Sequence, residues 1–350
     1  MPSNSLGALF ANRSNNFNLI RLFAALSVIY GHAGVVTGGG EPDILLRLMG
    51  YKFIGGVAVD VFFVLSGFLI SASAQSGQGA IYYIASRVLR IYPALIVCVC
   101  LSILVLGVFY SGDSFDFFSV STWRYLWVNS SALNTEYFLP GVFDGRPDKA
   151  INGSLWSIPV ELRMYFVVLL LHFVGCLERK SIFNLLFFVC ALLAFFRPSI
   201  FNPSLLHPSH LHVVGMFALG MFYWVNRGSV FINPWVLLMM LLFAGVVHGT
   251  PNFGYAYVIL LPYALWCIAF SPGFFWFNRV GDYSYGVYLY GWPVQQCIAA
   301  SFPSMTTLQN TMAAVIVALG MGFLSWNIVE KPSLQLKKLF RKRVAKRVHA

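Results

Sequence analysis

Residues 53–72 read FIGGVAVDVFFVLSGFLISA, and Asp60 is the only charged side chain among these twenty residues. A helix needs about 20 mostly apolar residues to cross the hydrocarbon core of a bilayer. The run is therefore long and apolar enough to span a membrane, and similar runs recur along the chain. This pattern predicts an all-α, polytopic membrane protein.

The composition of the 350 residues supports the same fold class. Hydrophobic residues make up 58% of the chain and charged residues only 10%, whereas a soluble domain carries about 25% charged residues. So much apolar content also excludes a disordered chain. The six cysteines lie in or beside apolar runs without a CxxC pair, so we expect neither a zinc site nor a disulfide framework.

The apolar runs predict about ten transmembrane helices in a single domain. The first run contains Arg21 and is not followed by a small-residue cleavage site, so we expect it to remain as a span rather than a signal peptide. No internal repeat is visible, so the inverted-repeat pattern of many transporters is missing. The predicted spans are residues 17–36, 53–72, 91–110, 154–175, 181–197, 210–226, 230–248, 254–271, 282–300 and 309–329.

The distribution of basic residues predicts that both termini are cytoplasmic. Positive residues accumulate in cytoplasmic connections, and eight of the 23 Lys and Arg residues lie in residues 331–350. With the N-terminus inside, fifteen basic residues fall inside and six outside. We therefore expect a cytoplasmic segment (1–16), a transmembrane domain (17–329) and a basic tail (330–350) that contacts anionic lipid. The net charge of +11 then implies membrane lipids as partners, and no nucleic acid.

The longest connection, residues 111–153, is predicted to face outside and is rich in aromatic residues. Such residues form an interfacial belt at many membrane surfaces. A loop of this length is also often functional, and flat rings can serve as platforms for sugars. Both interpretations remain open. The aromatic residues include Trp123, Tyr125, Trp127, Tyr137, Phe138 and Phe143.

Ionisable side chains inside spans are costly unless they are paired or hydrated, so each is a functional candidate. Arg21 and His32 lie eleven residues apart on the first span, about three helical turns and roughly 16 Å along one face. They are candidates for binding and for base catalysis. The alternative is an arginine that reaches the headgroups and a histidine that is hydrogen-bonded within the bundle. The candidates taken from the spans are Arg21, His32, Asp60, Glu161, Arg163 and His172.

Two acidic residues are candidates for orienting a base. Asp60 is either neutral or paired with a cation, and His32 and Arg21 are the nearest candidates along the sequence. A carboxylate that accepts from one imidazole nitrogen leaves the other free as a base. Glu161, about two turns beyond Ser154, could act in the same way. Each acid could instead belong to a structural pair.

Arg87 and Arg90 lie three residues apart, and thus on one helical face, at the inner end of the third span. Two guanidinium groups so placed suit phosphate, which arginine binds bidentately. Ordinary positive-inside topology is the alternative. His172 lies near the inner end of its span and is left outside the site.

Six blocks in order along residues 16 to 333 resemble acyltransferase family 3, a family of multi-pass membrane enzymes. Any one of them is weak evidence, whereas six in the family's order are strong evidence. The first is Arg21 with His32. The others are DVFFVLSGFLI (60–70), SRVLRIYP (86–93), SLWSIPVELRMYF (154–166), GDYSYGVYLYGWPV (281–294) and IVEKP (328–332).

The resemblance implies transfer of an acyl group, usually acetyl, from cytosolic acyl-coenzyme A to a hydroxyl of a surface or lipid-linked glycan, at the bacterial inner membrane and without a metal. It assigns function to Arg21 and His32 and to the Arg87 and Arg90 pair. Gly291 departs from the family, because relatives often carry a histidine there. The esterase-like domain fused to some relatives is not expected here. The rival hypothesis is a transporter or flippase with a buried polar path. The sequence does not indicate an oligomeric state.

Overall fold

The computed structural model describes residues 4–39, 43–112, 115–201 and 208–340. The described chain is all helical and contains no strand apart from two isolated bridges, so the all-α prediction is confirmed for this part. The α-helices are α1 (Leu6–Ala11), α2 (Phe17–Thr37), α3 (Ile44–Met49), α4 (Ile54–Ala74), α5 (Ala80–Phe109), α6 (Val120–Ser131), α7 (Ser157–Phe173), α8 (Lys180–Phe196), α9 (Pro208–Val225), α10 (Pro234–Val246), α11 (Phe253–Ala269), α12 (Ser284–Ser301), α13 (Thr307–Ser325) and α14 (Lys331–Gln335). The short helical turns are η1 (Gly153–Trp156), η2 (Pro198–Ile200), η3 (Phe275–Arg279), η4 (Trp326–Glu330) and η5 (Leu336–Phe340).

Each of the ten predicted spans lies on a helix, but only some helices have the length of a full crossing. Five described segments are long and apolar enough to cross a membrane, and four further apolar helices are shorter. The five are Phe17–Thr37, Ile54–Ala74, Ala80–Phe109, Gly153–Phe173 and Thr307–Phe340. Ten crossings therefore stay a prediction.

The structure also corrects several predicted boundaries. Helix α5 begins at Ala80 rather than at residue 91. Arg87 and Arg90 interrupt the apolar run in the sequence, but the backbone that carries them is already helical. Pro93 lies within α5 and does not end it, as is common in membrane proteins. The connection 111–153, expected as a loop, contains α6.

Helix α4 forms the centre of the bundle and packs against α2, α7, α9 and α11. Its crossing with α9 depends on two glycines. A Cβ at Gly67 would overlap the carbonyl oxygen of Phe217, and a Cβ at Gly220 would overlap that of Val64. Small residues allow helix backbones in membranes to approach closely, so this pair brings α9 against the helix that carries Asp60.

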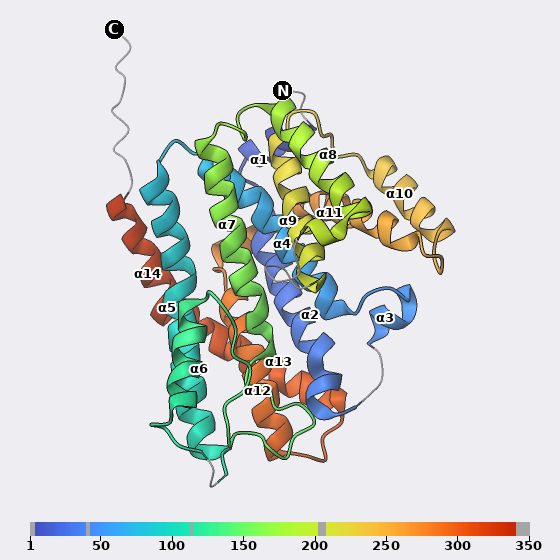
Figure 1. Ribbon diagram of the computed structural model, residues 1–350. Coiled ribbons are helices and arrows are strands. Elements are labelled where there is room, and N and C mark those ends of the chain that lie inside the picture. The colour runs from blue at the N-terminus through green and yellow to red at the C-terminus, as the bar shows by residue number, and fades with distance from the viewer. Residues whose placement is uncertain (1–3, 40–42, 113–114, 202–207, 341–350) are drawn as a thin grey trace.

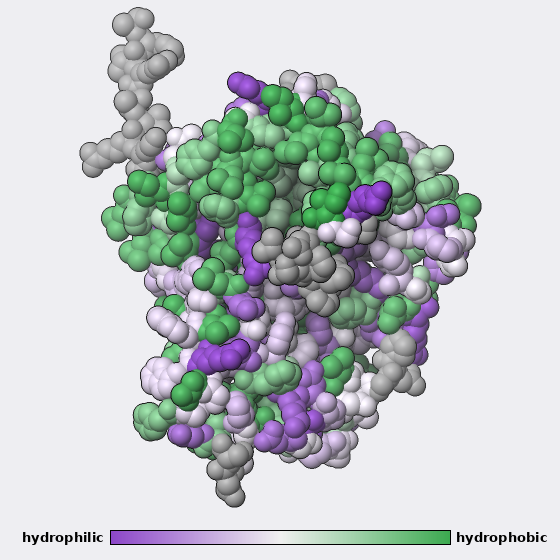
Figure 2. Space-filling view, viewed as in Figure 1, coloured by the Kyte–Doolittle hydropathy of each residue, from purple (hydrophilic) through white to green (hydrophobic). Residues whose placement is uncertain are grey.

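The peripheral helices expose apolar surface that water would not tolerate. Helix α8 buries only Phe183 and α10 buries only Ala244, although both helices are almost entirely apolar. Figure 2 shows hydrophobic side chains gathered across the upper half of one face, where α7 and α8 lie, and more hydrophilic ones below. Exposed apolar area on this scale marks a membrane-facing surface. The chain is a multi-pass membrane protein.

The segments predicted to face the cytoplasm and the segment predicted to face outside lie at opposite ends of the bundle. Helix α1 and the start of α5 lie at the upper end in Figure 1, whereas α6 lies toward the lower end. This arrangement agrees with the predicted placement of the N-terminus and the arginine pair on one side and residues 111–153 on the other. The side that faces the cytoplasm stays a prediction. Helix α1 packs onto the body, with Leu6 fully buried.

Candidate active site

One carboxylate joins two of the candidate arginines. Asp282 Oδ2 lies 2.7 Å from Arg90 Nη2 and 3.3 Å from Arg21 Nη1. The turn before α12 presents this carboxylate: Gly281 adopts a φ of 131°, which side chains rarely adopt, and a Cβ there would approach the Trp326 ring. The Ser284 hydroxyl donates to the other oxygen of Asp282. Helices α2, α5 and α12 therefore meet at this point.

Arg90 has a second acidic partner and lies between two aromatic rings. Its Nη1 lies 3.1 Å from Oε2 of Glu330, whose side chain is fully buried. The Ser325 hydroxyl donates to the other oxygen of Glu330 at 2.9 Å. The guanidinium carbon lies 5.6 Å from the Tyr285 ring centroid and 5.9 Å from that of Trp326. Arg90 is therefore neutralised by protein groups.

Arg87 has different surroundings, although it is only one turn away. Its guanidinium lies 6.0 Å from the Tyr83 ring centroid and 5.9 Å from that of Tyr165. No salt bridge of Arg87 occurs among the described residues, and its buried Nε has no hydrogen-bond partner there. Of the two arginines, Arg87 is the one with donors left for an anion.

Glu161 is linked to Arg87 by Tyr165, which contacts both residues. Its Oε1 accepts from the hydroxyls of Tyr165, at 2.6 Å, and Ser66, at 2.5 Å. The structure thus places Glu161 in a network with Ser66 and Tyr165 that links α4 and α7, and it records no contact with His32. The hypothesis that Glu161 orients His32 is not supported by this geometry.

His32 is oriented by its own helix. Its Nδ1 lies 2.7 Å from the carbonyl oxygen of Val28, one turn earlier. A carbonyl oxygen only accepts, so Nδ1 carries the proton, and in the neutral ring Nε2 keeps a lone pair. The ring packs against Phe53 at 5.3 Å and Trp292 at 4.9 Å between centroids. The neutral tautomer needed for a base is therefore set by the backbone.

The 111–153 connection helps to cover His32 through Trp292. The indole nitrogen of Trp292 donates to the carbonyl oxygen of Ala150 at 3.1 Å. The neighbouring Gly291 faces α2, where a Cβ would lie 2.7 Å from Cγ1 of Ile29. A histidine at position 291, which the family resemblance leads us to expect, would therefore require Ile29 to move.

Asp60 belongs to a separate buried cluster. Its Oδ2 accepts from Lys52 Nζ at 2.6 Å, from the Tyr257 hydroxyl at 2.6 Å and from His212 Nε2 at 3.0 Å. Its side chain is fully buried. Burial lowers the pKa of Lys52, and the charge of Asp60 opposes that shift. The pairing suggested by the sequence, with His32 or Arg21, is wrong.

Sequence reasoning missed four residues of these two clusters: Lys52, His212, Asp282 and Glu330. In the sequence, Lys52 counts only among the six basic residues predicted to lie outside. His212 and Asp282 lie within predicted spans, so the rule that intramembrane ionisable groups are candidates would have found both. Glu330 lies just beyond a predicted boundary.

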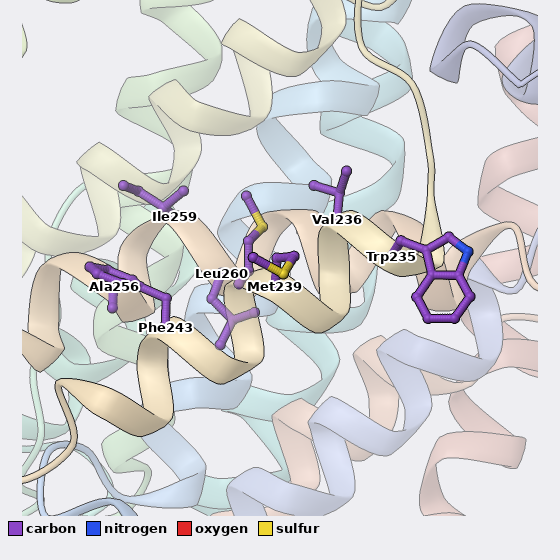
Figure 3. A pocket seen from close by; sticks show the side chains of 8 residues that line it. Trp235, Val236, Met239, Phe243, Ala256, Ile259 and Leu260 are labelled. Carbon is purple, nitrogen blue, oxygen red and sulfur yellow. The ribbon is translucent and has the colours of Figure 1, made fainter.

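One hollow lies away from all these groups. A groove of about 400 Å³ between α10 and α11 is lined by apolar side chains, among them Trp235, Met239, Phe243 and Ile259 (Figure 3). It offers no group for acid, base or phosphate chemistry. The charged clusters between α2, α4, α5, α7 and α12 therefore define the candidate active site.

Comparisons with known proteins assign the class. Residues 14–329 match the profile of acyltransferase family 3, described as an acyltransferase domain. The chain belongs to this family, and its enzyme class is that of the acyltransferases.

Two curated relatives are similar to the chain. An "O-acetyl transferase" of Shigella phage Sf6 is 30% identical over 344 residues, which cover 91% of this chain and 96% of the relative. "Nodulation protein 10" of Rhizobium leguminosarum bv. viciae is 30% identical over 167 residues, which cover 44% of this chain and 43% of the relative. No solved structure matches the chain.

Proposed function

We propose that the protein is an O-acyltransferase of the bacterial inner membrane that moves an acyl group, acetyl first of all, from cytosolic acyl-coenzyme A to a hydroxyl of a surface or lipid-linked glycan. Family membership supports acyl transfer. The printed name of the phage relative supports acetyl as the group and oxygen as the acceptor atom. Acetyl-coenzyme A is the donor in this proposal, and no step requires a metal.

The observation that carries the proposal is the geometry of His32. A hydroxyl is a weak nucleophile at neutral pH and needs a base within hydrogen-bond reach. The Nδ1 nitrogen donates its proton to the Val28 carbonyl oxygen, with 2.7 Å between the two heavy atoms. Nε2 is therefore left to accept the proton of the acceptor hydroxyl. Asp60 and Glu161, also assigned to catalysis from the sequence, would then support the bundle near the site rather than the imidazole itself.

The arginine region is the proposed donor site. Arg87 supplies the planar donors for a phosphate of coenzyme A. Arg90 and Arg21 would act mainly by keeping Asp282 and the ends of three helices in place. The pantetheine arm then runs along α2 for the roughly 16 Å that separate Arg21 from His32. The thioester carbonyl would meet the acceptor near His32.

The reaction balances with the chain's own groups. His32 Nε2 takes the hydroxyl proton as the acceptor oxygen bonds to the thioester carbon. The tetrahedral intermediate collapses, the carbon–sulfur bond breaks, and the leaving thiolate takes the proton from the imidazolium. The products are an ester and coenzyme A, and no proton is gained or lost.

A direct experiment separates this proposal from the transporter hypothesis. Purified protein in detergent is mixed with acetyl-coenzyme A and base-deacylated surface polysaccharide of the source cell. An acyltransferase forms free coenzyme A and an esterified glycan, which mass spectrometry identifies. A flippase consumes no acetyl-coenzyme A, so an unchanged donor would refute the proposal.

A further inference from the structure

A second hollow has a different lining from the apolar groove. It encloses about 310 Å³ between the turn after α3 and the turn that joins α10 to α11. Its size falls within the usual range for small-ligand sites, roughly 300–1,000 Å³. Its lining includes Arg47, Tyr51, His248, Thr250, Phe253 and Gly254.

The two turns are held together around aromatic rings. The His248 Nε2 nitrogen lies 2.8 Å from the carbonyl oxygen of Leu48, which ties one turn to the other. The Tyr51 and Phe253 rings lie 5.8 Å apart. Gly254 allows the Tyr51 ring to lie against α11, because a Cβ there would come within 2.9 Å of a ring carbon. The hollow therefore has a fixed aromatic wall.

The same hollow offers hydrogen-bonding groups beside that wall. Arg47 is exposed and contributes a planar guanidinium to the lining. Burial, and next the charge of Asp60, raise the pKa of Tyr51, so its hydroxyl stays protonated and can donate. Thr250 adds a hydroxyl. A flat apolar face with donors and acceptors around it suits a sugar ring, which has C–H faces and hydroxyl edges.

One short segment, Tyr51 to Phe53, connects this hollow to the Asp60 cluster and to His32. Tyr51 lines the hollow, and its ring lies 5.1 Å from that of Tyr257, whose hydroxyl bonds Asp60. Lys52 makes the ion pair with Asp60. Phe53 packs against His32. A ligand in the hollow would therefore lie beside the segment that contacts the proposed base.

We propose that this hollow binds a saccharide unit of the acceptor, with the sugar face on the Tyr51 ring, the Phe253 ring standing at 72° to it at the side, and the sugar hydroxyls on Arg47 and Thr250. The assignment rests on the proposed function and names where its acceptor binds. The predicted topology places Arg47 on the outer side, where a surface glycan would be met. The apolar groove between α10 and α11 has no part in this proposal.

The test separates acceptor binding from donor binding. Arg47→Gln removes the guanidinium at an exposed position, and the melting temperature of the purified variant checks its folding. Tyr51→Phe keeps the ring and removes the hydroxyl. The matched control is Arg124→Gln, which changes another outer arginine that is 70% exposed and pairs with Glu136. The probe is base-deacylated surface polysaccharide of the source cell, with acetyl-coenzyme A as donor.

Arg47→Gln is expected to raise the KM for polysaccharide about tenfold or more, since a hydrogen bond to a charged group is lost. Tyr51→Phe should raise it about threefold to tenfold. The KM for acetyl-coenzyme A should stay within about twofold, and Arg124→Gln should match the parent.

An unchanged polysaccharide KM in both pocket variants, or a parallel rise in both KM values, would overturn the saccharide site. A failure of the proposed function would give a different result. If the protein is not an acyltransferase of this kind, the parent itself would leave acetyl-coenzyme A intact.

Discussion

Asp282 accepts from Arg90 at 2.7 Å while the same oxygen also contacts Arg21, so the two arginines share one counter-charge. Glu330 supplies a second carboxyl group, which contacts Arg90. Two guanidinium groups and two carboxyl groups therefore lie within one cluster that joins α2, α5, α12 and η4. Charges inside a protein are tolerated when they are paired and hydrogen-bonded. This balance distinguishes Arg90 from its neighbour Arg87, which makes no such pair in the described chain.

The first prediction concerns this difference. Arg87→Lys should insert and fold normally but bind coenzyme A about tenfold more weakly, because lysine lacks the planar bidentate fork. Isothermal titration of purified protein with coenzyme A measures this change. Salt should weaken the binding of the parent as well.

Arg90→Lys serves as the comparison at the neighbouring position. A lysine cannot hold Asp282 and Glu330 in the same geometry, so the main expected effect is a lower melting temperature rather than a selective loss of affinity. Equal affinity of the parent and Arg87→Lys would return Arg87 to a topological role.

The second prediction concerns His32. Replacing it with Gln keeps a side chain of similar length but removes the base, so transfer should fall by about 10²- to 10⁴-fold. Affinity for coenzyme A should remain. Acetyl-coenzyme A consumption in the presence of polysaccharide measures the loss.

His172→Gln is the matched control, because His172 lies in the last turn of α7, contacts Glu178 in the connection to α8 and lies outside the site. It should retain activity. Transfer by His32→Gln within a few-fold of the parent would assign the base elsewhere, and His212, held by Asp60, would be the next candidate.

The third prediction concerns the buried charge of Asp60. Lys52→Met removes its cationic partner and should destabilise the protein by about 3 kcal/mol, since an uncompensated carboxylate is left inside. Lys52→Met combined with Asp60→Asn removes both charges and should recover part of that loss. Thermal unfolding of the two variants and of Asp60→Asn completes a double-mutant cycle. Additive effects of the two substitutions would show that the pair is not coupled.

Much of the fold could be predicted from sequence, because apolar runs of membrane length are a local property of the chain. The partners of the charged residues could not. Asp282 and Arg90 are separated by 192 residues, and Glu330 and Arg90 by 240. Such contacts depend on how the helices pack. Sequence proximity suggested His32 as the partner of Asp60, whereas the Gly67 and Gly220 contact brings α9, with His212, against α4 instead.

The fourth prediction tests that helix crossing. Alanine normally stabilises a helix relative to glycine by about 0.5–1 kcal/mol. Gly67→Ala should do the opposite and destabilise by about 3 kcal/mol or more, because its Cβ would meet the backbone of α9. Gly215→Ala in α9 is the control, since no atom lies within 4 Å of its added Cβ. Melting temperatures in one detergent compare the two, and a stabilising Gly67→Ala would contradict the close crossing.

The fifth prediction is the topology, with Arg87 and the turn before α5 facing the cytoplasm and residues 111–153 facing outside. Ser76 and Asn134 are exposed and lie in these two connections. Ser76→Cys and Asn134→Cys are each placed in a chain whose six native cysteines are replaced. An impermeant thiol reagent should label Asn134→Cys in intact cells, whereas Ser76→Cys should react only after the membrane is opened. Both cysteines should be labelled once the membrane is opened, which shows that each is accessible to the reagent. The reverse pattern in intact cells would show that the orientation is inverted. Arg87 would then lie outside, away from cytosolic coenzyme A, and the proposed donor site would be refuted.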